Sequence, residues 1–266
     1  MSLNIIILAA GNGKRMQSAL PKVMHKVGGK PMLEHVLISA KKLNPKSINV
    51  VINSKIESIK NSFKNYNVLW HNQLEQKGTA DAVNTVLPNL GKNEKVLILY
   101  ADTPLIDALL LEKFINYMPK SDVKVLTVEL DTPYGYGRII REQAEEEIIS
   151  KIIEETEADA KQKKIKECNT GIVFSDVGTL RSLISEVSNK NSKKEFYLTD
   201  IVSIANDKRL SVAPLLSKEF NSLLGVNDKC QLEKTEQIYQ NKKRNLFLKN
   251  GVTMLDSKSI FFKGDV

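Results

Sequence analysis

Residues 5–16 read IIILAAGNGKRM, and this stretch predicts how the fold begins. An uncharged apolar run leads directly into a loop with two glycines, and the cations Lys14, Arg15 and Lys22 follow within a few residues. Glycine lets backbone N–H groups approach a phosphate closely, and Lys and Arg neutralise its charge. We therefore expect a buried strand at Ile5–Ala10 that ends in a phosphate-binding loop.

An isolated G-x-G sequence is more often a tight turn with incidental surface cations. Here the complete arrangement of strand, G-x-G-x-R and Pro21-Lys22 favours phosphate binding. Two better-known glycine motifs are excluded. Met16 stands where the dinucleotide-binding fingerprint needs a small residue, and Pro31 stands where a P-loop needs Ser or Thr.

Short apolar runs alternate with amphipathic stretches through the first half of the chain. The predicted strands are Ile5–Ala10, Ile48–Ile52, Val68–His71 and Lys95–Tyr100, and the predicted helices are Met32–Lys42, Ile56–Lys64, Thr79–Leu87 and Ala108–Met118. This alternation predicts an α/β fold with a mostly parallel sheet, helices on both faces and ligands at the carboxyl ends of the strands.

The second half has a different pattern. It contains predicted strands at Val123–Glu129, Glu147–Ile153 and Glu167–Ser175, a glycine-rich turn region at Tyr134–Arg141, and predicted helices at Val177–Val187, Leu198–Asn206 and Asp228–Lys249. The last helix is long and polar, and its apolar stripe consists of Leu232, Ile238, Tyr239 and Leu246.

Composition and charge exclude several classes of function. The net charge is +8, but the basic residues are scattered and few aromatic residues lie among them, so no nucleic-acid binding is expected. No apolar run approaches the roughly 18 residues of a membrane span, and the N-terminus lacks the features of a signal peptide. Cys168 and Cys230 show no metal-ligand spacing, and reduced thiols fit a cytoplasmic protein. We interpret His25, His35 and His71 as structural, because they are too separated for a metal site.

Polar residues follow the apolar runs where ligands should gather. Asp102 could hold Mg²⁺, which needs only one or two protein ligands beside phosphate oxygens and water, but it would serve equally as a helix N-cap. The amide of Gln73 matches the edge of uracil. Gly78 and Thr79 open a helix whose N–H groups could hold a base or a phosphate. A solvent-exposed Gln and a plain helix start would explain these three residues as well.

Further motifs carry a family resemblance. They are Gln73 with Gly78-Thr79-Ala80, Tyr100-Ala101-Asp102-Thr103-Pro104, Gly135-Tyr136-Gly137-Arg138-Ile139, Glu154, Asn169-Thr170-Gly171, EFYLTD at 195–200 and Gly225-Val226-Asn227. Together with the opening LAAGNGKRM and Pro21-Lys22, they resemble the signature of the sugar nucleotidyltransferases. Within that family the chain is most similar to the uridyltransferase domain of the bifunctional bacterial enzyme that makes UDP-N-acetylglucosamine. The motifs follow the family's order over nearly the whole chain, but Ala101 stands where the family usually has Gly.

The resemblance implies a Rossmann-like nucleotidyltransferase fold with a C-terminal connecting helix. It implies Mg²⁺-dependent transfer of UMP from UTP to N-acetylglucosamine-1-phosphate, with release of pyrophosphate, in the supply of peptidoglycan and lipopolysaccharide precursors. It implies catalytic roles for Arg15 and Lys22 and metal ligation by Asp102 and Asn227. The substrate-binding positions that it implies are Leu8, Ala9, Ala10, Gly11, Lys22, Gln73, Gly78, Thr79, Tyr100, Ala101, Asp102, Gly137, Glu154, Asn169 and Asn227, of which Gly137, Glu154 and Asn169 match the family's amino-sugar positions.

Two alternative functions remain open. A related nucleotidyltransferase for another sugar-1-phosphate would keep the glycine loop and Asp102. A non-catalytic UDP-sugar-binding protein would be expected to lose Arg15, Lys22 or Asp102, and all three are present.

The resemblance also divides the chain. Residues 1–227 correspond to the uridylyltransferase domain, 228–250 to the connecting helix and 251–266 to the start of a following segment. No hexapeptide repeats follow Gly251, so we expect no β-helix, no acetyltransferase activity, and a monomer or weak dimer.

Overall fold

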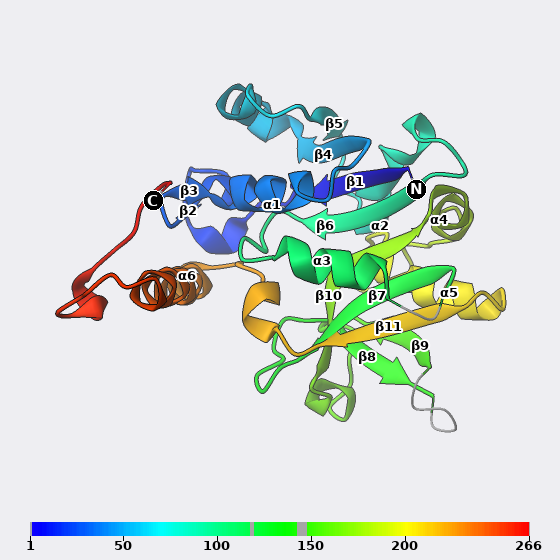
Figure 1. Ribbon diagram of the computed structural model, residues 1–266. Coiled ribbons are helices and arrows are strands. Elements are labelled where there is room, and N and C mark those ends of the chain that lie inside the picture. Colours follow the sequence, from blue (N-terminus) through cyan, green and yellow to red (C-terminus); the bar gives the residue numbers. More distant parts are fainter. Residues whose placement is uncertain (1, 118–119, 143–147, 266) are drawn as a thin grey trace.

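The computed structural model describes residues 2–117, 120–142 and 148–265, and for residues 54–58 it describes the backbone alone. Within these residues, nine strands form one mixed sheet: β1 (Leu3–Leu8), β4 (Ser47–Asn53), β5 (Leu69–Gln73), β6 (Lys95–Tyr100), β7 (Val123–Glu129), β8 (Arg138–Arg141), β9 (Ile149–Ile153), β10 (Glu167–Asp176) and β11 (Val212–Ser217). A short hairpin, β2 (Lys26–Val27) with β3 (Lys30–Pro31), lies outside this sheet (Figure 1).

The main path of the sheet runs β11-β7-β10-β6-β1-β4-β5. Strands β5, β4, β1 and β6 are parallel, and β10 runs antiparallel to both of its neighbours on this path. The chain therefore leaves β1 on one side, through β4 and β5, and returns to place β6 on the other side. A crevice for ligands forms where the strand order reverses in this way.

Five helices cover the two faces of the sheet in the described part of the chain: α1 (Met32–Lys41), α2 (Thr79–Asn84), α3 (Ala108–Ile115), α4 (Val177–Ile184) and α5 (Ile201–Asp207). Helix α6 (Lys229–Lys249) packs against the β2–β3 hairpin instead. In β1, Ile5 and Ile7 pack into the core with α1 and α3, whereas Ile6 and Leu8 pack with α2, α4 and α5. Successive side chains of a strand point to opposite faces, so a continuous apolar run is what a strand buried on both faces requires.

Most of the predicted elements are confirmed, with shifted ends. The segment predicted as a helix at Ile56–Lys64 is a 3-10 helix, Ser54–Phe63, and the predicted turn region at Tyr134–Arg141 ends in strand β8. Met118 and Glu147, at the ends of two predicted elements, lie outside the described residues. The sequence pattern missed β11, which contains Pro214; Pro is tolerated there because β11 is an edge strand.

Helix α6 packs differently from the prediction. Leu232 and Tyr239 of the predicted stripe contact a small cluster of Val27, Met32 and Val226, but Leu246 is 52% exposed. The buried residues of α6 are polar: Thr235, Gln240 and Arg244.

Gln240 and Arg244 are buried because they bind backbone of the C-terminal segment, whereas Thr235 donates to the Gln231 carbonyl within α6. The Gln240 amide bonds both the N–H and the carbonyl of Phe262 at 2.7 Å, and Arg244 Nε donates to the Ile260 carbonyl at 2.8 Å. The C-terminal segment thus runs beside α6 and reaches the β2–β3 hairpin, where Gly264 N donates to the Gly28 carbonyl at 2.8 Å (Figure 1). Among the described residues, none of the helices is both long and apolar enough to cross a membrane.

The glycine-rich turn before β8 is held by an ion pair in which the cation is buried and the carboxylate is partly exposed. Arg138 is 1% exposed, and its guanidinium lies 2.7 Å from the Glu155 carboxylate and donates to the Tyr136 carbonyl. Glu155 also accepts from the Gly135 N–H at 3.1 Å. Removal of Glu155 leaves a buried positive charge without its counterion.

We expect Glu155→Ala to lower the free energy of unfolding by about 3–5 kcal/mol, the usual cost of breaking a buried pair. Asp131→Ala is the matched control, because Asp131 pairs with Lys166 at the surface. Its removal should change the free energy of unfolding very little. Urea unfolding followed by circular dichroism measures both. Equal effects of the two substitutions would contradict a structural role for the Arg138–Glu155 pair.

Candidate active site

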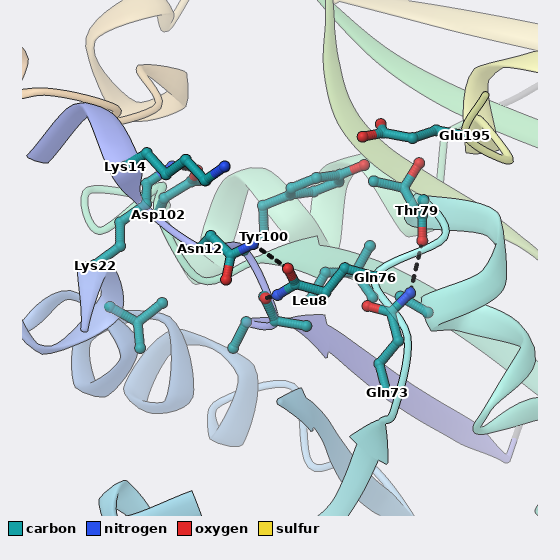
Figure 2. A pocket seen from close by; sticks show the side chains of 16 residues that line it. Leu8, Asn12, Lys14, Lys22, Gln73, Gln76, Thr79, Tyr100, Asp102 and Glu195 are labelled. Atoms are coloured by element: carbon teal, nitrogen blue, oxygen red, sulfur yellow. Dashed lines mark hydrogen bonds and ion pairs between the residues drawn. The ribbon is translucent and has the colours of Figure 1, made fainter. Parts of the chain in front are cut away.

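A cavity of about 440 Å³ opens at the carboxyl ends of β1 and β6. Its lining combines the loop after β1, the end of β5, the start of α2 and the end of β6 (Figure 2). The lining residues are Leu8, Ala9, Ala10, Gly11, Asn12, Lys14, Lys22, Val23, Gln73, Gln76, Gly78, Thr79, Ala82, Tyr100, Asp102 and Glu195. The parallel register pairs Leu8 with Tyr100, so the chain leaves both strands at the same level.

The glycine loop folds tightly against the turn that carries Lys22. Gly13 has φ 59°, and a Cβ placed there would lie 2.7 Å from the Lys22 Cβ. Gly13 is followed by a 3-10 turn, Lys14–Met16, whose Met16 side chain is buried. Only glycine allows this conformation together with this close approach. Met16, which excluded the dinucleotide fingerprint, is the core anchor of the loop.

Four predicted residues from three distant segments meet at one end of the cavity. The Lys22 ammonium lies 2.5 Å from Asp102 Oδ2 and 2.7 Å from Asn227 Oδ1. Arg15, exposed in the loop, donates to the same Asn227 oxygen at 3.1 Å. Two cationic side chains and two side-chain oxygens that accept from them therefore lie at one place.

The position of Asn227 follows from the start of α6. Asp228 caps the helix by accepting from Gln231 N at 2.8 Å, and Gln231 Oε1 accepts in return from Asn227 N at 2.6 Å. Val226 N donates to the Asp102 carbonyl at 2.8 Å, which ties the helix start to the end of β6. This reciprocal cap resembles a capping box and orients Asn227.

Gln73 marks the other end of the cavity and is only 4% exposed. Its amide NH₂ donates to the Gly78 carbonyl at 2.9 Å and to Asp81 Oδ2 at 2.7 Å, which leaves its Oε1 as the atom able to accept from a ligand. Gly78 has φ 125°, and a Cβ there would lie 2.4 Å from the Phe196 carbonyl oxygen. The GTA motif therefore requires glycine because the EFYLTD motif packs directly on it.

The predicted amino-sugar residues gather around Tyr100, beside the cavity. Gly137 accepts at its carbonyl from Asn169 N at 2.9 Å, and Glu154 accepts from Thr199 Oγ1 at 3.1 Å. A Cβ on Gly171 would lie 2.5 Å from the Tyr100 ring, so glycine makes room for this ring. Burial raises the pKa of Glu154, and burial together with the Glu154 and Asp102 charges raises the pKa of the Tyr100 hydroxyl.

Ten of the predicted site residues line this cavity. Arg15 and Asn227 join it through their contacts at Lys22, and Gly137, Glu154 and Asn169 lie beside it. Ala101 is fully buried with its side chain in the core; only its backbone stands at the sheet edge, where its N–H donates to the Leu8 carbonyl at 3.0 Å. Its methyl group therefore does not enter the cavity that Asp102 lines.

Sequence reasoning missed six lining residues: Asn12, Lys14, Val23, Gln76, Ala82 and Glu195. Gln76 contacts the Asn12 amide and the Ala10 carbonyl, so its loop closes on the glycine loop. Asn12, Lys14 and Glu195 stand inside the motifs quoted above, so the sequence carried a signal for them. Gln76 offered none, because its contacts cross 64 residues of sequence or more.

Comparisons with known proteins identify the family and the fold of this chain. A family model described as the MobA-like NTP transferase domain matches residues 5–164. The bifunctional protein GlmU of Idiomarina loihiensis is 39% identical over 96% of this chain, and that of Buchnera aphidicola subsp. Schizaphis graminum is 38% identical over 98%. The chain spans 56% of the length of each of these curated relatives.

Two solved structures share the fold. A putative glucose-1-phosphate thymidylyltransferase from Bacillus anthracis superposes with a TM-score of 0.67 over 96% of this chain and 98% of its own, at 19% identity. A UDP-glucose pyrophosphorylase complexed with UDP-glucose reaches 0.69 over 91% of this chain and 100% of its own, at 17% identity. The predicted α/β fold and the resemblance that the motifs indicated are both confirmed. The chain belongs to the family of MobA-like NTP transferase domains.

Proposed function

We propose that this chain transfers UMP from UTP to the phosphate of N-acetylglucosamine-1-phosphate and releases pyrophosphate. One observation carries the proposal: Arg15, Lys22, Asp102 and Asn227 converge at one end of the cavity, while Gln73 lies at its other end. A nucleoside triphosphate spans such a site with its phosphates at the cations and its base at the amide. The bifunctional GlmU relatives support the choice of this reaction among nucleotidyl transfers.

The side-chain oxygen Oε1 of Gln73 supports uracil as the base. Because its NH₂ is bound to Gly78 and Asp81, Gln73 presents only an acceptor. Uracil N3–H can donate to that acceptor, whereas cytosine has an unprotonated N3 that would face it.

The donor set at the cationic end fits Mg²⁺. Asp102 and Asn227 each direct an oxygen at the Lys22 ammonium, so the two oxygens point to a common place, and oxygen ligands are those that Mg²⁺ prefers. We infer that these two residues hold the ion. When bound, it would neutralise negative charge on the phosphate oxygens.

The chain's own residues supply the rest of catalysis by position and charge. The sugar phosphate is already an anion, so no general base is needed for its attack on the α-phosphorus. The glycine loop holds the triphosphate, and Arg15 and Lys22 stabilise the charge that grows as the bond to pyrophosphate breaks. Glu154 and Asn169 offer acceptors and a donor to the sugar.

The proposal is tested by pyrophosphate release across UTP, CTP, GTP and dTTP, each with several sugar-1-phosphates. We expect the highest kcat/KM for UTP with N-acetylglucosamine-1-phosphate. A higher value for another sugar phosphate would assign the chain to a different acceptor, and no release with any pair would refute nucleotidyl transfer.

Arg15→Ala should lower kcat by about 10²–10³-fold, the usual cost of losing one preorganised charge stabiliser. The KM for UTP should change much less, because the guanidinium acts mainly on charge that develops in the transition state. Arg15→Lys should recover only part of the loss, since an ammonium cannot bridge two oxygens as a planar fork does. Steady-state kinetics measure both variants.

Lys151→Ala, which removes an exposed cation in β9, is the control for net charge. If Arg15→Ala keeps a normal kcat, Arg15 is a solvated loop cation without a part in catalysis.

Gln73→Ala should raise the KM for UTP with little change in kcat, because a base contact binds ground and transition states alike. The loss should be on the order of 1–3 kcal/mol, since the partners of Gln73 are left unpaired. The KM for the sugar phosphate is the internal control and should stay constant. An unchanged KM for UTP would remove Gln73 from the base site.

A further inference from the structure

The segments that carry Lys22 and Asn227 touch at a second point, away from the cavity lining. The Lys229 ammonium donates to Nδ1 of His25 at 3.2 Å. His25 stands three residues after Lys22, and Lys229 stands two residues after Asn227. The Lys22–Asn227 and His25–Lys229 hydrogen bonds therefore connect the same two short segments at two points.

The backbone is ordered on both sides of the His25–Lys229 contact, and the Lys229 side chain is exposed. His25 is 6% exposed, and its N–H donates to the Lys22 carbonyl at 3.3 Å while its own carbonyl accepts from Met32 N at 2.9 Å. Lys229 is the first residue of α6, directly after the Asp228 cap. The contact thus joins two ordered backbones and not two free loops.

Apolar packing closes the gap beside this contact. Val27, Met32 and Val226 are fully buried against one another, and Val226 directly precedes Asn227. This packing draws the hairpin after His25 towards the residue before Asn227. The apolar packing pulls the two segments together, and the His25–Lys229 contact fixes the distance between them.

The His25 ring suits this role only when neutral. A neutral imidazole can accept at Nδ1 from an ammonium, whereas an imidazolium cannot accept at all. Burial, and next the Lys229 charge, lower the pKa of His25, so the accepting form is favoured.

We propose that His25 and Lys229 are positioning residues for nucleotidyl transfer, and that their contact fixes the gap across which Lys22 meets Asn227. This inference rests on the proposed function of that site. Neither residue lines the cavity, so their effect passes through Lys22 and Asn227. A displacement of about 1 Å in a catalytic group can cost on the order of 10²-fold in rate. Loss of the His25–Lys229 contact can therefore lower kcat by shifting Lys22 or Asn227.

The first test is a double-mutant cycle. His25→Leu and Lys229→Met should each lower kcat by about 10–100-fold, the range typical of residues that orient a ligating group. The KM for UTP should stay near that of the wild type, because the Gln73 end is untouched. The double variant should be no worse than either single variant, since both break the same contact.

Lys234→Met is the matched control, because Lys234 is exposed on the same helix and should leave kcat unchanged. His25→Asn places an amide oxygen near the position of Nδ1 and should recover part of the activity. Circular dichroism and thermal unfolding check that each variant is folded.

A second readout is independent of turnover. Mn²⁺ binding in the presence of UTP, followed by electron paramagnetic resonance of the free ion, should weaken by about tenfold in His25→Leu and remain normal in Lys234→Met.

Normal kcat and normal Mn²⁺ affinity in folded His25→Leu would overturn the inference. Additive losses in the double variant, without rescue by Asn, would show two separate structural effects and overturn it as well. A wild-type chain that releases no pyrophosphate would refute the proposed function instead, and the Mn²⁺ titration would still decide whether His25 positions Asn227.

Discussion

The parallel pairing of β1 with β6 is the constraint on which the site depends. Leu8 and Tyr100 are partners in this pairing, so the loops that follow both strands start side by side. The crossover after β5 makes this possible, because it returns the chain to the free side of β1. The glycine loop and Asp102, 90 residues apart in sequence, then face one cavity.

Cationic side chains and side-chain oxygens contact one another at this edge of the sheet without any substrate. Lys22 is bound by Asp102 and Asn227, and Arg15 shares the Asn227 oxygen. These contacts place both cations at the edge of the sheet where a polyanion would meet them. Gln73 shows the same principle at the other end, where two bonds to its NH₂ fix the direction of its carbonyl oxygen.

Helix α6 connects this edge to the end of the described chain. Its capped first turn orients Asn227, and two of its buried polar side chains, Gln240 and Arg244, bind the backbone of residues 258–262. An apolar stripe would have been unable to satisfy those backbone groups, which explains why Gln240 and Arg244 are buried while Leu246 is exposed.

The sequence by itself determined the fold class, because that depends on local pattern, and its motifs named most of the candidate site residues through their resemblance to a known family. Apolar runs of strand length and amphipathic stretches predict a sheet covered on both faces, and glycines mark the turns at residues 13 and 78 where φ is positive. Tertiary structure alone decided which segments meet. The pairing of the edge strand β11, the Gln76 contacts and the His25–Lys229 pair each join residues far apart in the chain. The burial of the Ala101 methyl group depends on which face of the sheet it meets, and the sequence does not distinguish the two faces. Local propensity carries no information on such contacts, since they form only when the crossover has placed β6 beside β1 and α6 has closed against the hairpin.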